Sequence, residues 1–327
     1  MGKEVINRPL LSVIIPCFNA APYLRQCVEN LSVICPYEII IVDDGSTDDT
    51  RRIGLELQSQ HNYIRLVSQD NKGVSVARFE GWRKSVGEYV TFLDVDDKII
   101  VSEDVTSLLN GRYDIIKTAG YYVNGEALEK YDNRFQGEIR GKEKAIGYML
   151  DGMFMPFIHS AIYRRTAIDE SCFESNPRFK IGEDLLFNMK LFGKDNLTIL
   201  SIDAPIYYYV QQPTSVMHTK IWGFDYINAF NDQLTNIVDE SVPSLHHKAV
   251  EHRFQDYLGT LMFPEVKFKK SYYEKIIQMV TDEPELLRLL PAYKRMLLRH
   301  SLLFRPYLAF IHILQRLRGR EKREVLN

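Results

Sequence analysis

Short apolar segments alternate with segments of helical spacing over the first hundred residues, and this alternation constrains the fold more than any other feature. The apolar runs occupy residues 11–15, 38–42, 64–68 and 89–93. Helical spacing occurs between them, over residues 21–31, 47–60 and 74–85. Apolar strands separated by helices of this length are typical of a parallel sheet that is covered on both faces. The sequence therefore predicts an α/β fold with a mostly parallel sheet and helices on both sides.

Acidic side chains follow two of these strands, at the point where each strand ends. Asp43 and Asp44 follow the second strand, and Asp94, Asp96 and Asp97 follow the fourth. In such sheets ligands bind at the carboxyl ends of the strands. Three neighbouring carboxylates repel one another unless a cation neutralises them, and oxygen ligands select hard ions such as Mg²⁺ or Mn²⁺. For each acidic group taken alone, a solvated turn or a helix cap stays open as the alternative.

Charge is divided unevenly along the chain. The net charge is −2, but residues 294–327 contain nine Lys or Arg and two acids, a net of +7 that leaves −9 for the rest. An acidic body argues against an enzyme that binds nucleic acid. Residues 305–320 combine an apolar face with basic side chains at helical spacing, which predicts a peripheral membrane contact through 294–323. Packing of this face on the protein, or a homodimer contact, is the alternative.

The expected location is the cytoplasm, at the inner face of the plasma membrane. The four cysteines form no CxxC pair, which favours buried free thiols in a reducing compartment. The first ten residues lack the apolar core of a signal peptide. Since no apolar run reaches about 18 residues, we expect no membrane-spanning helix.

Four motifs in the first hundred residues occur in a characteristic order. They are SVIIPCFN at 12–19, IVDDGSTD at 41–48, NKGVSVAR at 71–78 and GEYVTFLDVDD at 87–97. This order and spacing resembles the family 2 glycosyltransferases, inverting enzymes of the GT-A fold, of the type that builds bacterial surface polysaccharides such as capsule. The likeness extends more loosely to about residue 218, through Gly-Glu-Asp at 182–184 and the segment 207–215.

The resemblance implies two regions. Residues 1–220 would form the GT-A domain, a Rossmann-like, mostly parallel sheet with helices on both faces that binds the nucleotide-sugar and carries out catalysis. Residues 221–327 would form a smaller helical C-terminal region that ends in the basic amphipathic tail. This division agrees with the chain length, because 327 residues suggest about two domains.

The resemblance also implies a donor site for a nucleotide-sugar, most often a UDP-sugar. The donor-binding residues would be Pro16, Phe18, Asn19, Asp43, Asp44, Arg78, Asp94 and Asp96. Asp44 would accept a hydrogen bond from the imide N–H of the base, while Asp43 braces the turn; a carboxylate can accept from uracil there. Arg78 would lean toward the base or the diphosphate.

A metal ion and a catalytic base complete the implied site. Asp94 and Asp96 form the DxD motif of the family, and Asp96, Asp94 and His218 would hold Mn²⁺ or Mg²⁺ against the two phosphates. Asp184 would take the proton from the acceptor hydroxyl, with Glu183 beside it. One base suits a single displacement that inverts the anomeric centre.

The implied activity is that of a metal-dependent hexosyltransferase whose acceptor is a glycan or a lipid-diphosphate-linked oligosaccharide. Two departures from the family pattern occur: Phe79 replaces the usual Asn after Arg78, and Val210, Gln211 and Gln212 stand where Arg is common. A nucleotidyltransferase is an alternative, although it would need a Gly-rich basic loop where this chain has Pro16–Asn19. A non-catalytic nucleotide-sugar-binding protein on the same fold is another.

Overall fold

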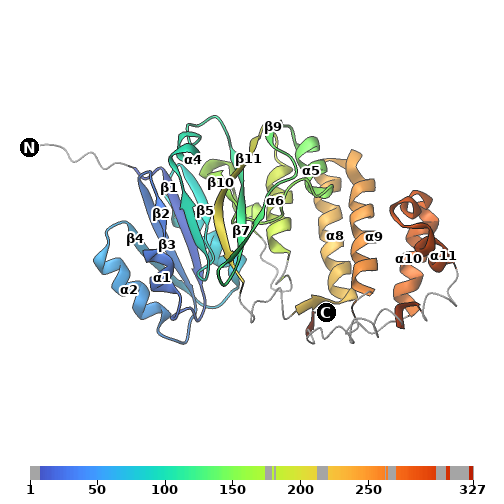
Figure 1. Cartoon of the computed structure of the whole chain (residues 1–327), viewed down its shortest axis with the longest axis horizontal. Coiled ribbons are helices and arrows are strands. Elements are labelled where there is room, and N and C mark those ends of the chain that lie inside the picture. Colours follow the sequence, from blue (N-terminus) through green and yellow to red (C-terminus); the bar gives the residue numbers. More distant parts are fainter. Residues whose placement is uncertain are drawn as a thin grey trace, which may run out of the picture. The chain divides into compact units, whose positions relative to one another are not determined.

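The computed structural model describes residues 8–173, 179, 182–211, 220–261, 263, 270–299, 307–309 and 324–326. The chain divides into two compact units, with the boundary between Gln211 and Gln212. The boundary predicted from the sequence lies later, after residue 220. Figure 1 labels the elements of both units.

An eleven-stranded sheet forms the framework of the N-terminal unit, in the order β2-β6-β11-β7-β10-β5-β1-β3-β4, with β8 paired to β7 and β9 to β11. The strands are β1 (Leu11–Cys17), β2 (Ser32–Val33), β3 (Tyr37–Asp44), β4 (Ile64–Gln69), β5 (Tyr89–Phe92), β6 (Lys98–Val101), β7 (Ile115–Asn124), β8 (Ala127–Tyr131), β9 (Gly137–Arg140), β10 (Ala161–Arg164) and β11 (Thr198–Val210). This mostly parallel sheet confirms the predicted fold class.

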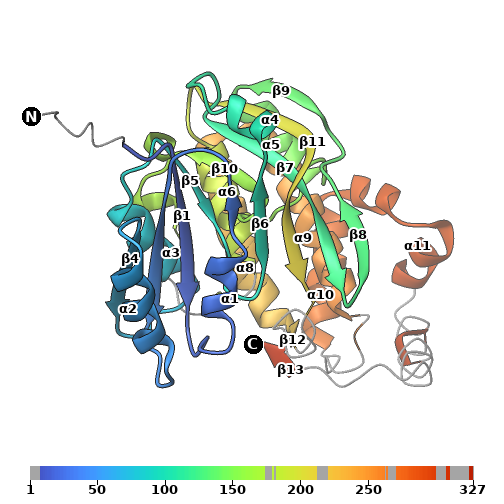
Figure 2. The same cartoon turned by 60° about the vertical axis from the view of Figure 1, so that its left-hand side comes forward.

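The carboxyl ends of the strands that matter for the site meet at one edge of the sheet. β1 is parallel to β3 and β5, and β3 to β4. β10 runs antiparallel to both β5 and β7, so β7 points the same way as β5, and β11 is parallel to β7. Figure 2 shows β1, β7 and β11 ending on the same side. Residues that follow any of these strands can therefore act on one ligand.

Helices cover both faces of the sheet. They are α1 (Leu24–Glu29), α2 (Thr50–Gln60), α3 (Val74–Lys84), α4 (Glu103–Ser107), α5 (Lys142–Leu150) and α6 (Glu183–Phe192), with short 3₁₀ turns at Arg165–Ala167 and Glu170–Cys172. Leu11 and Val13 of β1 share a buried cluster with Leu24 of α1 and Leu57 of α2. Ile14 points to the other face, where a Cβ on Gly81 of α3 would lie 2.3 Å from its side chain. Alternate residues of one strand thus pack against helices on opposite sides.

Two strands differ from the sequence prediction. We predicted that β1 stops before Pro16, but it continues to Cys17 and Pro16 pairs with Val42 of β3. On its other side β1 pairs with β5 only as far as Ile14, so the missing N–H of Pro16 breaks no bond there. The sequence pattern also predicts separate strands at 197–202 and 206–210, but these residues belong to one strand, β11, whose register shifts on either side of Pro205.

The C-terminal unit is mainly helical. It contains α8 (Phe224–Ser241), α9 (His246–Leu261), α10 (Lys270–Asp282) and α11 (Ala292–Arg299), 3₁₀ turns at Pro243–Leu245 and Pro284–Leu289, and the parallel pair β12 (Lys220–Trp222) and β13 (Glu324–Leu326). Its core includes Phe224, whose ring stacks on that of Tyr272 with the centroids 3.9 Å apart.

The basic amphipathic tail lies almost entirely outside the described residues. Only 307–309 of its apolar part are described, and there Leu308 is buried in the core of the C-terminal unit while Tyr307 packs against that core. The membrane contact through 294–323 stays a prediction. Among the described residues, no helix combines the length and apolar character needed to cross a membrane.

Candidate active site

The loops that follow β1 and β3 are joined at the carboxyl edge by Asn19. Its side-chain oxygen accepts hydrogen bonds from the Thr47 backbone N–H (2.8 Å) and hydroxyl (3.2 Å), and its own N–H donates to the Ser46 hydroxyl at 3.0 Å. Asp43 accepts from the Ser46 N–H at 3.0 Å. Asn19 has a φ of 49°, in the left-handed region that Asn tolerates better than most residues. These contacts fix the shape of the edge where a nucleoside is expected.

Asp44 organises the segment that leads into α3. One carboxylate oxygen accepts from the Gln69 side chain (2.7 Å) and the Lys72 N–H (2.8 Å), and the other accepts from the Gly73 N–H at 2.8 Å. The side chain is buried, so these bonds compensate its lost hydration. The contact with a base imide stays a prediction.

Pro16 and Phe18 lie on either side of the end of β1. Pro16 is buried inside the strand, whereas 51% of Phe18 is exposed at the edge of the sheet. An exposed ring at this position suits stacking on a base, and the donor contacts of both residues stay predictions.

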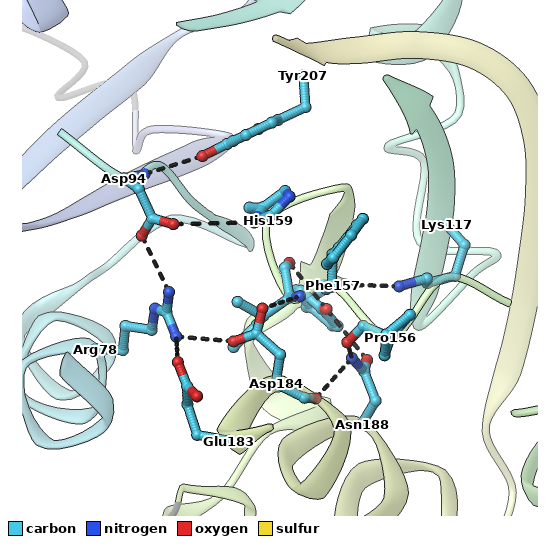
Figure 3. A network of polar contacts seen from close by, with 12 residues as sticks. Arg78, Asp94, Lys117, Pro156, Phe157, His159, Glu183, Asp184, Asn188 and Tyr207 are labelled. Atoms are coloured by element: carbon cyan, nitrogen blue, oxygen red, sulfur yellow. Dashed lines mark hydrogen bonds and ion pairs between the residues drawn. The ribbon is translucent and has the colours of Figure 1, made fainter. Parts of the chain in front are cut away.

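Arg78 joins three carboxylates from two distant parts of the sequence (Figure 3). Its guanidinium, buried on α3, donates to Asp94 after β5 at 3.0 Å and to Asp184 of α6 at 2.9 Å, and lies 3.4 Å from Glu183. The sequence predicts that Arg78 leans toward the base or diphosphate of a donor, and the structure directs its side chain to these acids. One guanidinium thereby brings the expected donor acid and the expected base together.

Burial and this arginine set the charges of the cluster. Burial alone would lower the pKa of Arg78, but the carboxylates raise it above its ordinary value. Burial raises the pKa of Asp94, yet Arg78 and His159 outweigh that effect and hold it below its usual range. For Glu183, burial and then the neighbouring Asp184 charge raise the pKa to about 8. At neutral pH the cluster therefore holds a charged arginine, an ionised Asp94 and a mostly protonated Glu183.

The loop before β10 holds Asp184 in place from the side away from Arg78. The Ile158 backbone N–H donates to the second Asp184 oxygen at 3.1 Å. The Asn188 amide donates to the Pro156 carbonyl (2.7 Å) and to the Asp184 backbone carbonyl (2.9 Å), which fastens this loop to α6. Each Asp184 oxygen thus has one fixed partner, as expected for a positioned proton acceptor.

Lys117 of β7 supports the same loop and is a residue that the sequence analysis missed. Its side chain is fully buried and its ammonium donates to the Phe157 carbonyl at 2.8 Å. Burial lowers its pKa to about 7, although Asp184 acts in the opposite direction. The available signal was a lysine directly after the apolar pair Ile115 and Ile116. Buried lysines with such shifted pKa values concentrate at functional sites.

His159 is the second residue that the sequence analysis missed. Its ring stacks between Phe157 (centroids 4.8 Å apart) and Tyr207 (4.0 Å), and its Nδ1 lies 3.9 Å from Asp94. Burial lowers its pKa to about 4, so the ring is neutral at pH 7. No sequence signal identified it, because contact with Asp94 depends on the pairing of β10 with β5.

The remaining acids after β5 have different environments. Asp97 is buried and accepts from the Tyr207 hydroxyl (2.5 Å) and the Val210 N–H (2.7 Å), so it ties this loop to β11. Asp96 is half-buried, and burial followed by the charge of Asp94 raises its pKa. Asp94 and Asp96 together therefore hold negative charge that a cation would stabilise.

Comparison with known proteins identifies the family. Residues 12–172, which include the loops after β1, β3 and β5 and the Lys117 and His159 positions, match the family model described as Glycosyl transferase family 2. The chain belongs to this family.

Relatives of this family 2 glycosyltransferase come from several bacteria. It is 25% identical over 294 residues to glycosyltransferase GlyG of Streptococcus pneumoniae serotype 4, a match that covers 80% of this chain and 92% of GlyG. It is 43% identical over 232 residues to the uncharacterized glycosyltransferase YibD of Escherichia coli K12, which covers 67% of this chain and 66% of YibD.

A solved structure with a similar fold is that of S. aureus TarS 1-349 in complex with UDP-GlcNAc. It has a TM-score of 0.64 at 20% sequence identity, over 96% of this glycosyltransferase and 93% of the TarS chain. At this identity the likeness concerns the fold, and it supports the expected GT-A architecture.

Proposed function

We propose that this glycosyltransferase moves a sugar from a nucleotide-sugar, most often a UDP-sugar, to a hydroxyl of a glycan or lipid-diphosphate-linked oligosaccharide, with inversion, in bacterial surface-polysaccharide synthesis. The observation that carries the proposal is the Arg78 bridge between Asp94 and Asp184. It brings an acid of the expected donor site and a candidate base to one edge of the sheet. The UDP-GlcNAc bound to TarS and the name of a further relative, the minor teichoic acid biosynthesis protein GgaB of Bacillus subtilis, support the donor and the pathway.

In this mechanism Asp184 accepts the proton of the acceptor hydroxyl while that oxygen attacks the anomeric carbon. The bond from the anomeric carbon to the diphosphate breaks in the same displacement, and the nucleoside diphosphate leaves with the bonding electrons. Arg78 and the Ile158 N–H keep the carboxylate oriented throughout. A displacement with a single base inverts the configuration.

We also propose that the donor binds together with Mn²⁺ or Mg²⁺ at Asp94 and Asp96. The half-buried Asp96 beside a second carboxylate fits such an ion, because burial and then the charge of Asp94 raise its pKa and disfavour its ionised form in the absence of a cation. Within the described part of the chain, no three His, Cys, Asp or Glu side chains form a metal-binding group, so diphosphate oxygens would have to supply further ligands. His218, the third expected ligand, lies outside the described residues. A bound cation would compensate the charge of the departing diphosphate.

The proposal predicts metal-dependent release of nucleoside diphosphate. Purified protein is incubated with a panel of UDP- and GDP-sugars and glycan acceptors, with Mn²⁺ or with excess EDTA. We expect release from a UDP-sugar with Mn²⁺ and a loss of at least about 10²-fold in EDTA and in Asp96→Asn, which removes charge at nearly constant volume. Asp104→Asn, an acid in the first turn of α4, is the matched control and should retain activity.

Three results would contradict parts of this proposal. Full activity in EDTA would exclude the metal. Release from GDP-sugars alone would exclude the UDP donor. Binding of a UDP-sugar without turnover on any acceptor would favour a non-catalytic binding protein.

We further propose that the enzyme works at the cytoplasmic face of the membrane, docked by its basic C-terminal end. A lipid-linked acceptor would make such docking useful, and each basic residue near anionic lipid contributes about 1 kcal/mol. The full chain should co-sediment with anionic vesicles at low salt, and a chain that ends before Lys294 should bind less. Equal binding by both chains, or by neither, would remove this role.

A further inference from the structure

Five aromatic rings form a closed group at the carboxyl ends of β7 and β11. The members of this aromatic face are Tyr122, Tyr131, Phe157, His159 and Tyr209. Successive ring centroids are separated by 4.7 Å (Tyr122–Tyr131), 5.5 Å (Tyr131–Phe157), 4.8 Å (Phe157–His159), 6.1 Å (His159–Tyr209) and 5.9 Å (Tyr209–Tyr122). These are contact distances for aromatic side chains.

Strand register explains why the rings lie together. Tyr122 of β7 pairs with Tyr209 of β11, so both project from the same face of the sheet. Tyr131 of β8 pairs with Gly120, where a Cβ would lie 2.3 Å from the Tyr131 hydroxyl. Glycine at position 120 therefore leaves the space that the Tyr131 ring occupies.

The aromatic face adjoins the candidate base through the loop before β10. Phe157 directly precedes Ile158, whose N–H donates to Asp184, and its own carbonyl accepts from Lys117. His159 lies 3.9 Å from Asp94 and neither of its buried ring nitrogens has a hydrogen-bond partner. The aromatic face and the carboxylate cluster thus share one stretch of backbone, and Figure 3 shows Phe157 and His159 of this stretch beside the cluster.

The five rings of the aromatic face are not all buried. Tyr131 and His159 are buried, but Tyr122, Phe157 and Tyr209 are half-buried and leave part of their surface accessible. The aromatic face lies at the same edge of the sheet as Asp44 and Asp94. It lies on the β7–β11 side of β5, whereas β3 lies on the other side. The expected donor residues lie at the carboxyl ends of β1, β3 and β5 or on α3, so the β7–β11 side is available for the second substrate.

We propose that the aromatic face binds a sugar ring of the acceptor, whose apolar C–H face stacks on Tyr122, Tyr209 and Phe157 while its reacting hydroxyl points to Asp184. The inference rests on the proposed function and specifies the acceptor as a glycan. Pyranose rings have one face of C–H groups and a rim of hydroxyls, which matches rings that are apolar in the middle and polar at the tip. The aromatic face carries no formal charge, which suits a neutral sugar.

The test compares two double variants of the same strand pair. Tyr122→Leu with Tyr209→Leu removes two rings of the aromatic face. Tyr121→Leu with Tyr208→Leu is the matched control, because these half-buried rings, 5.3 Å apart, belong to the same two strands and project from the opposite face. A general loss of folding would affect both variants, and thermal unfolding of each detects it.

Binding is measured apart from turnover, by saturation-transfer NMR on lactose, cellobiose, maltose and N,N′-diacetylchitobiose with UDP and Mn²⁺ present. The parent should bind at least one disaccharide, the aromatic-face variant about tenfold more weakly, and the control within a factor of three. Phe157→Leu, a single change, should weaken binding in the same direction.

Absence of binding to the parent, or equal weakening in both double variants, would overturn the acceptor site. Release of UDP from UDP-sugars is followed in separate samples of the same protein preparations, without added UDP. If the parent releases no UDP from any donor, the proposed function fails, whatever the disaccharide result. If UDP release is normal and the aromatic-face variant binds disaccharide like the parent, only the acceptor site fails.

Discussion

Replacement of Asp184 by Asn is expected to lower the rate of sugar transfer by about 10²–10⁴-fold, the usual contribution of a positioned proton acceptor. The amide keeps the volume of the side chain and removes its basicity. Arg78 would still pair with Asp94, so donor affinity should stay within a factor of about three of the parent. Turnover is measured by diphosphate release and donor affinity by calorimetry with UDP. A parallel collapse of UDP affinity would assign Asp184 to the donor site.

Glu183→Gln is the control for this experiment, because Glu183 is the adjacent acid and approaches the same guanidinium. Its pKa of about 8 means that glutamine imitates the form that prevails at pH 7. We therefore expect nearly parental turnover at pH 7, whereas a loss as large as that of Asp184→Asn would contradict the assignment of the base.

Glu183→Gln should also change the way in which the stability of the protein depends on pH. An acid whose folded-state pKa lies above its ordinary value of 4.5 binds more protons in the folded than in the unfolded protein between pH 4.5 and 8. Stability of the parent accordingly falls as pH rises through this window, and Glu183→Gln lacks that contribution. Thermal unfolding of the variant should show a smaller decline between pH 5 and 8.

Replacement of Arg78 by Met is expected to give the largest loss of stability, about 3–5 kcal/mol, because it leaves the half-buried Asp94 and Asp184 without their buried counter-charge. Turnover should be lost as well, since Asp94 and Asp184 would repel each other. Urea unfolding measures the change. Arg52→Met is the matched control, an arginine on α2 that pairs with Asp49 and Glu56 at the surface, and it should unfold close to the parent.

A double variant separates charge repulsion from lost packing. In Arg78→Met with Asp184→Asn one uncompensated charge is gone, so the combined loss should be smaller than the sum of the two single losses. Additive losses would mean that Arg78 acts through packing alone.

The sequence predicts the sheet well because its strands are fully buried. Uninterrupted apolar runs mark β1, β3 and β5. The segments between these runs have helical spacing, and a helix between two buried strands indicates that the strands are parallel. The sequence predicts the ends of a strand less well where pairing with a distant strand determines them. β11 continues past residue 202 because β7 runs beside it along most of its length, a long-range contact that no local pattern records.

The sequence predicts those site residues that belong to recognisable motifs. Asp94 and Asp184 belong to segments recognisable in the sequence, but their common partner Arg78 lies 16 and 106 residues away. The packing of α3 on β1 and β3, where Gly81 meets Ile14 and Val42, places Arg78 within reach of both acids. Lys117 and His159 have no motif at all, since their importance comes from burial beside the cluster.

The central claim, inverting transfer with Asp184 as the single base, is tested most directly by the anomeric configuration of the first product. Proton NMR of the linkage formed from an α-linked UDP-sugar, recorded early in the reaction, should show a β-linked sugar with the parent enzyme. An α-linked product would contradict the account, because retention requires a second nucleophilic step that a lone base cannot supply.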